Sequence, residues 1–108
     1  MVKRLLTVNR LAVAAAAALL LLVLPPAPAL AGCNKKVVLY NASWCPYCRQ
    51  VRAILGRHHI KYSIRDATTV PVQAYMVRRF GDTAVPRTVI GGVVVEGVDE
   101  ARILRLCR

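Results

Sequence analysis

The sequence predicts a small α/β domain that follows an N-terminal signal segment. Two observations predict the α/β class. Short apolar stretches that suit strands alternate with amphipathic stretches that suit helices, and two adjacent glycines separate the last two strand-like stretches. A third observation distinguishes a signal segment from the domain: the first 32 residues begin with basic residues and continue with a long apolar run. We therefore divide the chain into a signal segment, residues 1–32, and one domain, residues 33–108.

The signal segment has the order of a secretory signal. Three basic residues within the first ten precede an unbroken apolar run over residues 11–24, and small residues follow. The apolar character extends to Gly32, close to the roughly 20 residues that cross a bilayer, but Pro25, Pro26 and Pro28 interrupt it. We expect removal of this segment and export of the domain to the periplasm or to the outer face of the cytoplasmic membrane.

The domain that remains is small and basic. Three of the 16 basic residues lie in the signal, so the domain has 13 against five acidic residues, a formal charge of +8. The arginines are scattered, with no basic run and no interleaved aromatic residues, which argues against a nucleic-acid partner. We expect a monomer with a solvated surface.

The sequence predicts a strand, a helix and a second strand in the first half of the domain. Residues 36–41 are β-branched and apolar on both faces, as in a strand inside a sheet. Apolar residues then recur at steps of three and four over residues 46–58, which predicts an amphipathic helix with Pro46 in its first turn. Residues 60–66 alternate between apolar and polar, which predicts a second strand.

The sequence predicts a helix, a β-hairpin and a last helix in the second half of the domain. These elements are a helix over residues 71–80, two strands over residues 87–90 and 93–96, and a helix over residues 100–107. Pro71 suits the first turn of its helix and Gly81 ends it. Gly91 and Gly92 tolerate the positive φ of a hairpin turn. Asp99 is placed to cap the last helix.

Two cysteines in the stretch CPYC carry the chemistry that the sequence predicts. Cys45 lies just before the predicted helix at residues 46–58, and Cys48 lies within its first turn. The free N–H groups and the positive end of the helix dipole favour a thiolate at Cys45, which makes it the nucleophile. Cys48 lies one turn further on the apolar face, so it is protected from solvent and is the resolving cysteine.

Two other interpretations of the motif have less support. A structural zinc site needs four ligands, and the other cysteines and histidines, which are Cys33, His58, His59 and Cys107, form no second pair of this spacing. A purely structural bond between Cys45 and Cys48 would constrain little of the unfolded chain.

The sequence resembles the glutaredoxins of the thioredoxin-like superfamily. CPYC is the usual glutaredoxin motif, and the order of elements over residues 36–106 is similar to that family's order. The resemblance implies a four-stranded mixed sheet flanked by three helices. It also implies a dithiol disulfide oxidoreductase with no bound cofactor, glutathione as a candidate co-substrate, and disulfide-containing proteins or small thiols as partners. An iron–sulfur or metal carrier on the same fold is the alternative.

The resemblance also implies a set of substrate-binding residues. These are Trp44, Tyr47, Val85, Pro86, Arg87, Gly97 and Asp99. Pro86 corresponds to the family's cis-proline, although composition alone favours a trans bond. If the bond is cis, the backbone of Val85 faces Cys45 and pairs with an extended substrate. Asp99 corresponds to the residue that meets the glutathione amine.

Two positions depart from the family pattern. The family often has a lysine three positions before the first cysteine, where this sequence has Ala42, and a glycine where it has Glu96. Arg87 is a candidate to supply part of the missing positive charge. We therefore expect a preference for protein or peptide substrates over glutathione.

Cys33 has two incompatible predicted fates. LAGC, residues 30–33, fits the lipobox of bacterial lipoproteins, whose cysteine carries a lipid anchor, and the match at all four positions favours lipidation. ALA, residues 29–31, equally fits an ordinary signal-peptidase site. In the glutaredoxin order the first and last strands are parallel, so the final helix returns toward the start of the first strand. Cys107 is then near enough to Cys33 for a disulfide.

Overall fold

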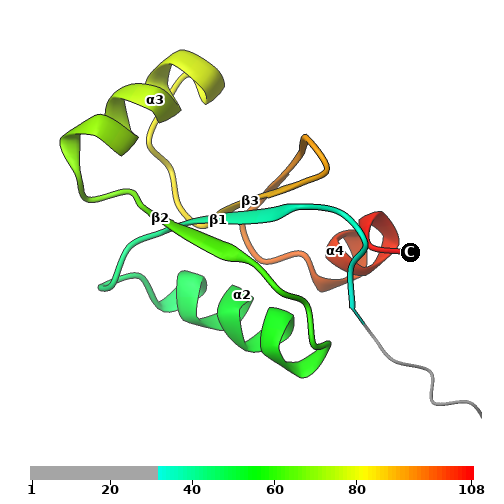
Figure 1. Ribbon diagram of the computed structural model, residues 1–108. Helices are drawn as coiled ribbons and strands as arrows, with labels where there is room; N and C mark the ends of the chain where they lie inside the picture. The colour runs from blue at the N-terminus through cyan, green and yellow to red at the C-terminus, as the bar shows by residue number, and fades with distance from the viewer. Residues whose placement is uncertain (1–31) are drawn as a thin grey trace, which may run out of the picture.

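The computed structural model describes residues 32–108, so the predicted signal segment lies outside the described residues except for Gly32. The elements are β1 (Val37–Asn41), α2 (Pro46–Arg57), β2 (Ser63–Asp66), α3 (Val70–Phe80), β3 (Arg87–Ile90), β4 (Val93–Glu96) and α4 (Glu100–Leu106). Figure 1 shows them in one domain. Within this part of the chain, no helix is both long enough and apolar enough to cross a membrane.

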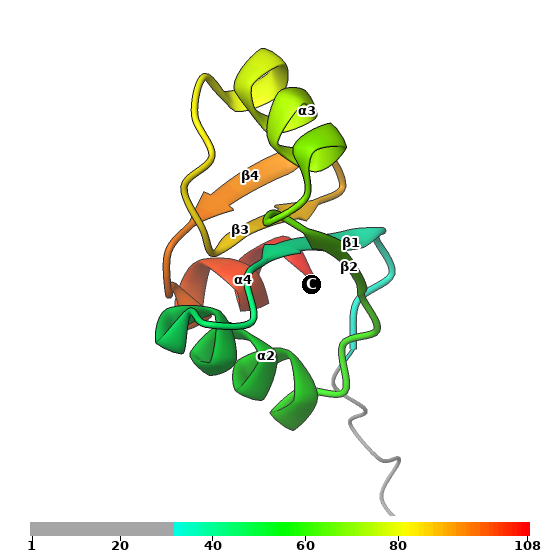
Figure 2. The same ribbon diagram turned by 90° about the vertical axis from the view of Figure 1, so that its left-hand side faces the viewer.

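The four strands form one mixed sheet in the order β2-β1-β3-β4. β1 is parallel to β2 and antiparallel to β3, and β3 and β4 form an antiparallel hairpin, so β4 runs parallel to β1. Figure 2 shows the three layers: α3 covers one face of the sheet, and α2 and α4 cover the other. The mixed sheet with three helices is the fold that the resemblance implies, so this prediction is confirmed.

Each face of the sheet has its own apolar core. Val37 and Leu39 of β1 pack with the apolar sides of α2 and α4, including Leu55 and Ile103. Tyr40, next along β1, points to the other face because successive strand residues alternate, and it packs with Met76 of α3 and its neighbours. β1 is therefore buried on both faces, as its composition predicts.

The second strand is shorter than the sequence predicts. The chain leaves α2 through His59, which has a positive φ of 53°. The Ile60 N–H then donates to the Leu55 carbonyl, so Ile60 belongs to the turn and is buried under α2. Pairing with β1 begins only at Ser63, opposite Val38. The predicted strand at residues 60–66 is therefore wrong in its first three residues.

Candidate functional site

The dithiol lies where β1 ends and α2 begins. Cys45 has extended φ and ψ and is the N-cap of α2, and Pro46 lies in the first turn, where no N–H is needed. The Cys48 N–H donates a hydrogen bond to Cys45 Sγ, with N and S 3.1 Å apart. The N-terminal end of α2, with its free N–H groups, therefore faces Cys45 Sγ.

The two sulfurs have unequal surroundings. Both cysteines are buried, with 0% of Cys48 and 3% of Cys45 exposed, so their difference lies in their contacts and not in their exposure. Burial raises the pKa of the Cys48 thiol to about 11, and the hydrogen bond with the Cys45 side chain acts in the same direction. Cys48 therefore keeps its proton at neutral pH.

The loop before β3 closes over the dithiol. The Val85–Pro86 peptide bond is cis, as the family resemblance implies and composition alone does not. Val85 packs against the buried cluster of Ala42, Cys45 and Cys48. The cis-proline loop and the start of α2 therefore face each other.

A cleft of about 470 Å³ opens beside the dithiol. Its walls are formed by Ala42, Trp44, Ala67, Thr68, Gln73, Thr83, Ala84 and Val85. None of these side chains is charged, and Trp44 at the rim is 71% exposed. Tyr47 is also exposed but does not line the cleft. Neither cysteine is among the lining residues, and the cleft adjoins the buried dithiol through Ala42 and Val85.

Comparison with known proteins identifies the family. The Glutaredoxin family model matches residues 37–95, more than half of the chain. This chain belongs to the glutaredoxin family. A glutaredoxin of Pseudomonas aeruginosa is 33% identical over 69 residues, which cover 63% of this chain and 82% of that relative. The general activity that the family supports is thiol–disulfide oxidoreduction.

Solved structures of glutaredoxins share the fold. A glutaredoxin from Archaeoglobus fulgidus superposes with a TM-score of 0.60 at 23% identity, over 69% of this chain and 88% of that one. The buckwheat glutaredoxin in complex with glutathione superposes with a TM-score of 0.53 at 22% identity, over 64% of this chain and 66% of that one.

In this glutaredoxin the turn between β4 and α4 is attached to the cis-proline loop. Gly97 has a positive φ of 69°, and its N–H donates to the Pro86 carbonyl over 3.0 Å. Asp99 is the N-cap of α4, where its carboxylate accepts from the Arg102 N–H over 3.1 Å. The structure therefore brings Gly97 to the site and gives Asp99 a capping contact that the sequence also predicts.

Arg87 does not serve the site as the sequence interpretation proposed. Its side chain is 2% exposed, and Nη2 donates to Asp82 Oδ1 over 2.7 Å and to Glu96 Oε1 over 3.1 Å. The hydrogen bond from Arg87 also lowers the pKa of the Asp82 carboxyl. Arg87 is thus shared between two exposed carboxylates, and the three side chains together keep a net negative charge. Arg87, the candidate to supply part of the missing positive charge, is therefore already paired with carboxylates of the protein.

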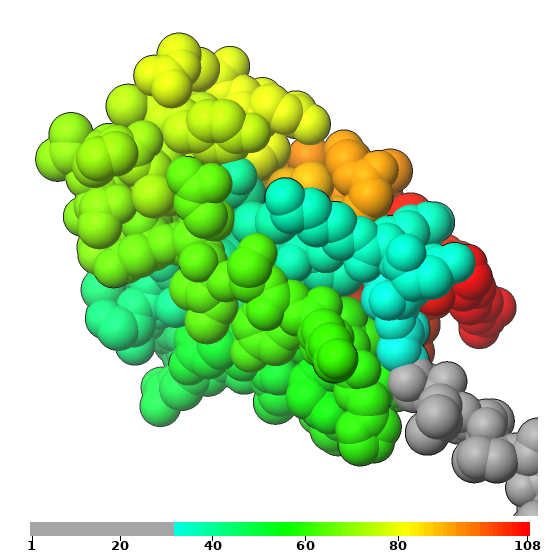
Figure 3. Space-filling model, in the orientation of Figure 1, coloured from blue at the N-terminus to red at the C-terminus, as the bar shows by residue number. Residues whose placement is uncertain are grey.

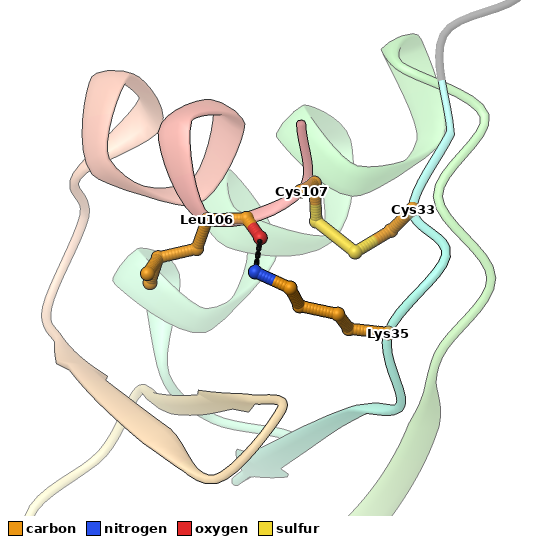
Figure 4. The surroundings of a disulfide bond; sticks show 4 residues. All are labelled: Cys33, Lys35, Leu106 and Cys107. Atoms are coloured by element: carbon orange, nitrogen blue, oxygen red, sulfur yellow. Dashed lines mark hydrogen bonds between the residues drawn. A yellow bond between two sulfur atoms is a disulfide. The ribbon is translucent and has the colours of Figure 1, made fainter.

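Cys33 and Cys107 form a disulfide in the structure, as Figure 4 shows, with their Cα atoms 4.5 Å apart. Beside it, Lys35 Nζ donates to the Leu106 carbonyl over 2.6 Å. Both contacts join the start of the domain to the end of α4. The sequence alone favours lipidation of Cys33 over this disulfide, and a sulfur held in a disulfide carries no lipid.

Five residues of the cleft were not predicted from the sequence: Ala67, Thr68, Gln73, Thr83 and Ala84. Thr68 lies in the turn between β2 and α3, Gln73 lies near the start of α3, and Thr83 lies in the loop that follows α3. Only the folded chain places them opposite Trp44, and no motif or spacing marks them. Within residues 32–108, His, Cys, Asp and Glu side chains form no group of three or more that could hold a metal ion.

Proposed function

We propose that this glutaredoxin is an exported dithiol oxidoreductase that exchanges disulfides with proteins and small thiols through Cys45 and Cys48. The observation that carries the proposal is the unequal pair of sulfurs. One sulfur accepts a backbone N–H at the helix start, and the other is buried with a raised pKa. The reaction needs only this pair and an accessible partner, so no bound cofactor enters the proposal.

The exchange proceeds in two steps. The Cys45 thiolate attacks one sulfur of the substrate disulfide, forms a mixed disulfide, and releases the other substrate sulfur as a thiolate. Cys48 then gives its proton to solvent and attacks Cys45 Sγ, which releases the second substrate sulfur. Two electrons pass to the substrate, and a Cys45–Cys48 disulfide forms. The same steps in reverse oxidise a substrate dithiol.

Serine variants of the two cysteines test these roles. Cys48→Ser keeps the attacking sulfur and loses the resolving one, so it accumulates a mixed disulfide with a cystine-containing peptide. Cys45→Ser captures no peptide and loses exchange activity, because the buried Cys48 thiol is neither ionised nor accessible. Non-reducing mass spectrometry measures the capture, and equal capture by both variants would falsify the assignment of roles.

The cleft supports protein or peptide substrates over glutathione. Its walls carry no charge, and Ala42 occupies the position where the family often has a lysine for a glutathione carboxylate. Glu96 also argues against glutathione, because Arg87 is shared between Asp82 and Glu96 and the three side chains keep a net negative charge. The glutathione complex of the buckwheat relative supports glutathione as a weaker co-substrate.

The bond between Cys33 and Cys107 supports an exported domain without a lipid anchor. Disulfides of this kind persist in oxidising compartments outside the cytoplasm, in agreement with the predicted signal. Protein from the native host distinguishes the two fates of Cys33. A non-reduced digest should contain a peptide that joins Cys33 to Cys107, whereas the mass of a diacylglyceryl group on Cys33 would exclude the disulfide.

A further inference from the structure

A second hollow lies on the face of the sheet that α3 covers. Its volume is about 330 Å³, and it shares no lining residue with the cleft beside Cys45. Three cations, Lys36, Arg65 and Arg79, line it together with Ser63, Tyr75 and Phe80, and we call this site the basic hollow. Its volume is within the range of about 300–1,000 Å³ that is typical of small-ligand sites.

Three segments that are distant in the sequence build the basic hollow. Lys36 directly precedes β1, Arg65 lies in β2, and Arg79 lies in the last turn of α3. Arg65 is the register partner of Tyr40 in β1, so both side chains point to the α3 face. Figure 3 shows this side of the molecule, with the yellow of α3 beside the cyan of β1 and the orange of the hairpin.

Aromatic rings hold the two guanidinium groups in place. Arg65 lies over the Tyr75 ring, 5.7 Å from its centroid, and Arg79 lies over the Phe80 ring at 5.3 Å. Tyr75 is itself stacked on Tyr40 with centroids 6.2 Å apart. A guanidinium that lies on a ring keeps its N–H groups available at its edge. The cations are thus partly positioned before any ligand arrives.

No carboxylate neutralises these cations. All five acidic residues of the chain lie within the described range and make contacts elsewhere. Their contacts are Asp66 with Thr68, Asp82 and Glu96 with Arg87, Asp99 with the Arg102 N–H, and Glu100 with Arg57. Among residues 32–108, Lys36, Arg65 and Arg79 therefore form no ion pair.

We propose that the basic hollow binds a phosphate group, carried either by a small organic phosphate or by the headgroup of an anionic phospholipid. Two arginines and a lysine around one concavity match a phosphate group, whether a monoester or the diester of a lipid headgroup, because guanidinium edges donate pairs of hydrogen bonds to its oxygens. The hydroxyl of Ser63 is a further donor on the wall. The binding is independent of the dithiol reaction, since the two sites share no residue.

A matched pair of double variants tests this proposal. Arg65→Gln/Arg79→Gln removes two charges from the basic hollow. Lys61→Gln/Arg78→Gln removes two charges from exposed positions that do not line it. The probes are glycerol phosphate, followed by amide chemical shifts, and vesicles of phosphatidylcholine that contain phosphatidylglycerol. Vesicles of phosphatidylcholine alone are the blank.

The expected result is that glycerol phosphate or the anionic vesicles bind the unmodified protein and that the hollow variant weakens binding by at least about tenfold. The control variant should weaken it much less. Binding of glycerol phosphate identifies a soluble ligand, and binding of the vesicles alone identifies a lipid headgroup. Equal losses of affinity in the two double variants would show that net charge alone explains the binding, which contradicts a site in the basic hollow. Binding of neither probe would also overturn the proposal. Disulfide exchange should stay unchanged in both variants, which also verifies that they fold.

Discussion

Thr83 is the residue whose replacement most simply tests how the cleft selects its substrate. Its side chain is exposed on the cleft wall, and the wall carries no charge. We predict that Thr83→Lys lowers the KM for a glutathione mixed disulfide by up to about fivefold, the range of an exposed ion pair. The rate with an uncharged peptide disulfide should not change. Thr83→Gln is the control of similar length, and the same KM in both variants would show that charge does not limit glutathione use.

Single residues also show where sequence reasoning reaches its limit. The spacing of Cys45 and Cys48 predicts their unequal surroundings, because their roles follow from the helix start that lies between them. The role of Arg87 could not be predicted in the same way. Its partners are fixed by a loop and by the β3–β4 register, which places Glu96 opposite it. Tertiary pairing, rather than local pattern, decides whether a charge is free.

At the scale of elements, α4 depends on its N-cap. The helix has only seven residues, so the contact between Asp99 and the Arg102 N–H is a large part of what defines its start. We predict that Asp99→Ala lowers the free energy of unfolding by about 1 kcal/mol, whereas Asp99→Asn keeps most of the stability because asparagine also caps. Urea denaturation measures both. Equal destabilisation would mean that the negative charge matters more than the cap.

Most elements follow from local signals. Gly81 ends α3 with a left-handed backbone, and Gly91 and Gly92 form the hairpin turn, as their sequence positions predict. The start of β2 could not be predicted in this way. Ile60 is apolar because it is buried against α2 in the turn that follows the helix, and it is not part of a strand. Alternation alone cannot separate these two causes when a strand is only four residues long.

At the scale of the whole molecule, the disulfide joins the two ends of the domain. Cys33 and Cys107 are 74 positions apart, so the bond closes nearly the whole folded chain. We predict that Cys33→Ala/Cys107→Ala lowers the free energy of unfolding by on the order of 4 kcal/mol, the value for a loop of this length in the chain-entropy model. Denaturation of the oxidised proteins measures it. An unchanged free energy of unfolding would mean that the bond does not constrain the unfolded chain.

The proposed mechanism depends on the difference between Cys45 and Cys48. The rate of alkylation of each sulfur, measured against pH, tests that difference most directly. In the fully reduced protein, mass spectrometry of the digested chain follows Cys45 and Cys48 separately. Cys45 should react at neutral pH. Cys48 should react only as the pH approaches about 11, because its burial raises the pKa and keeps the proton on the sulfur. Alkylation of Cys48 at neutral pH as fast as that of Cys45 would contradict the account.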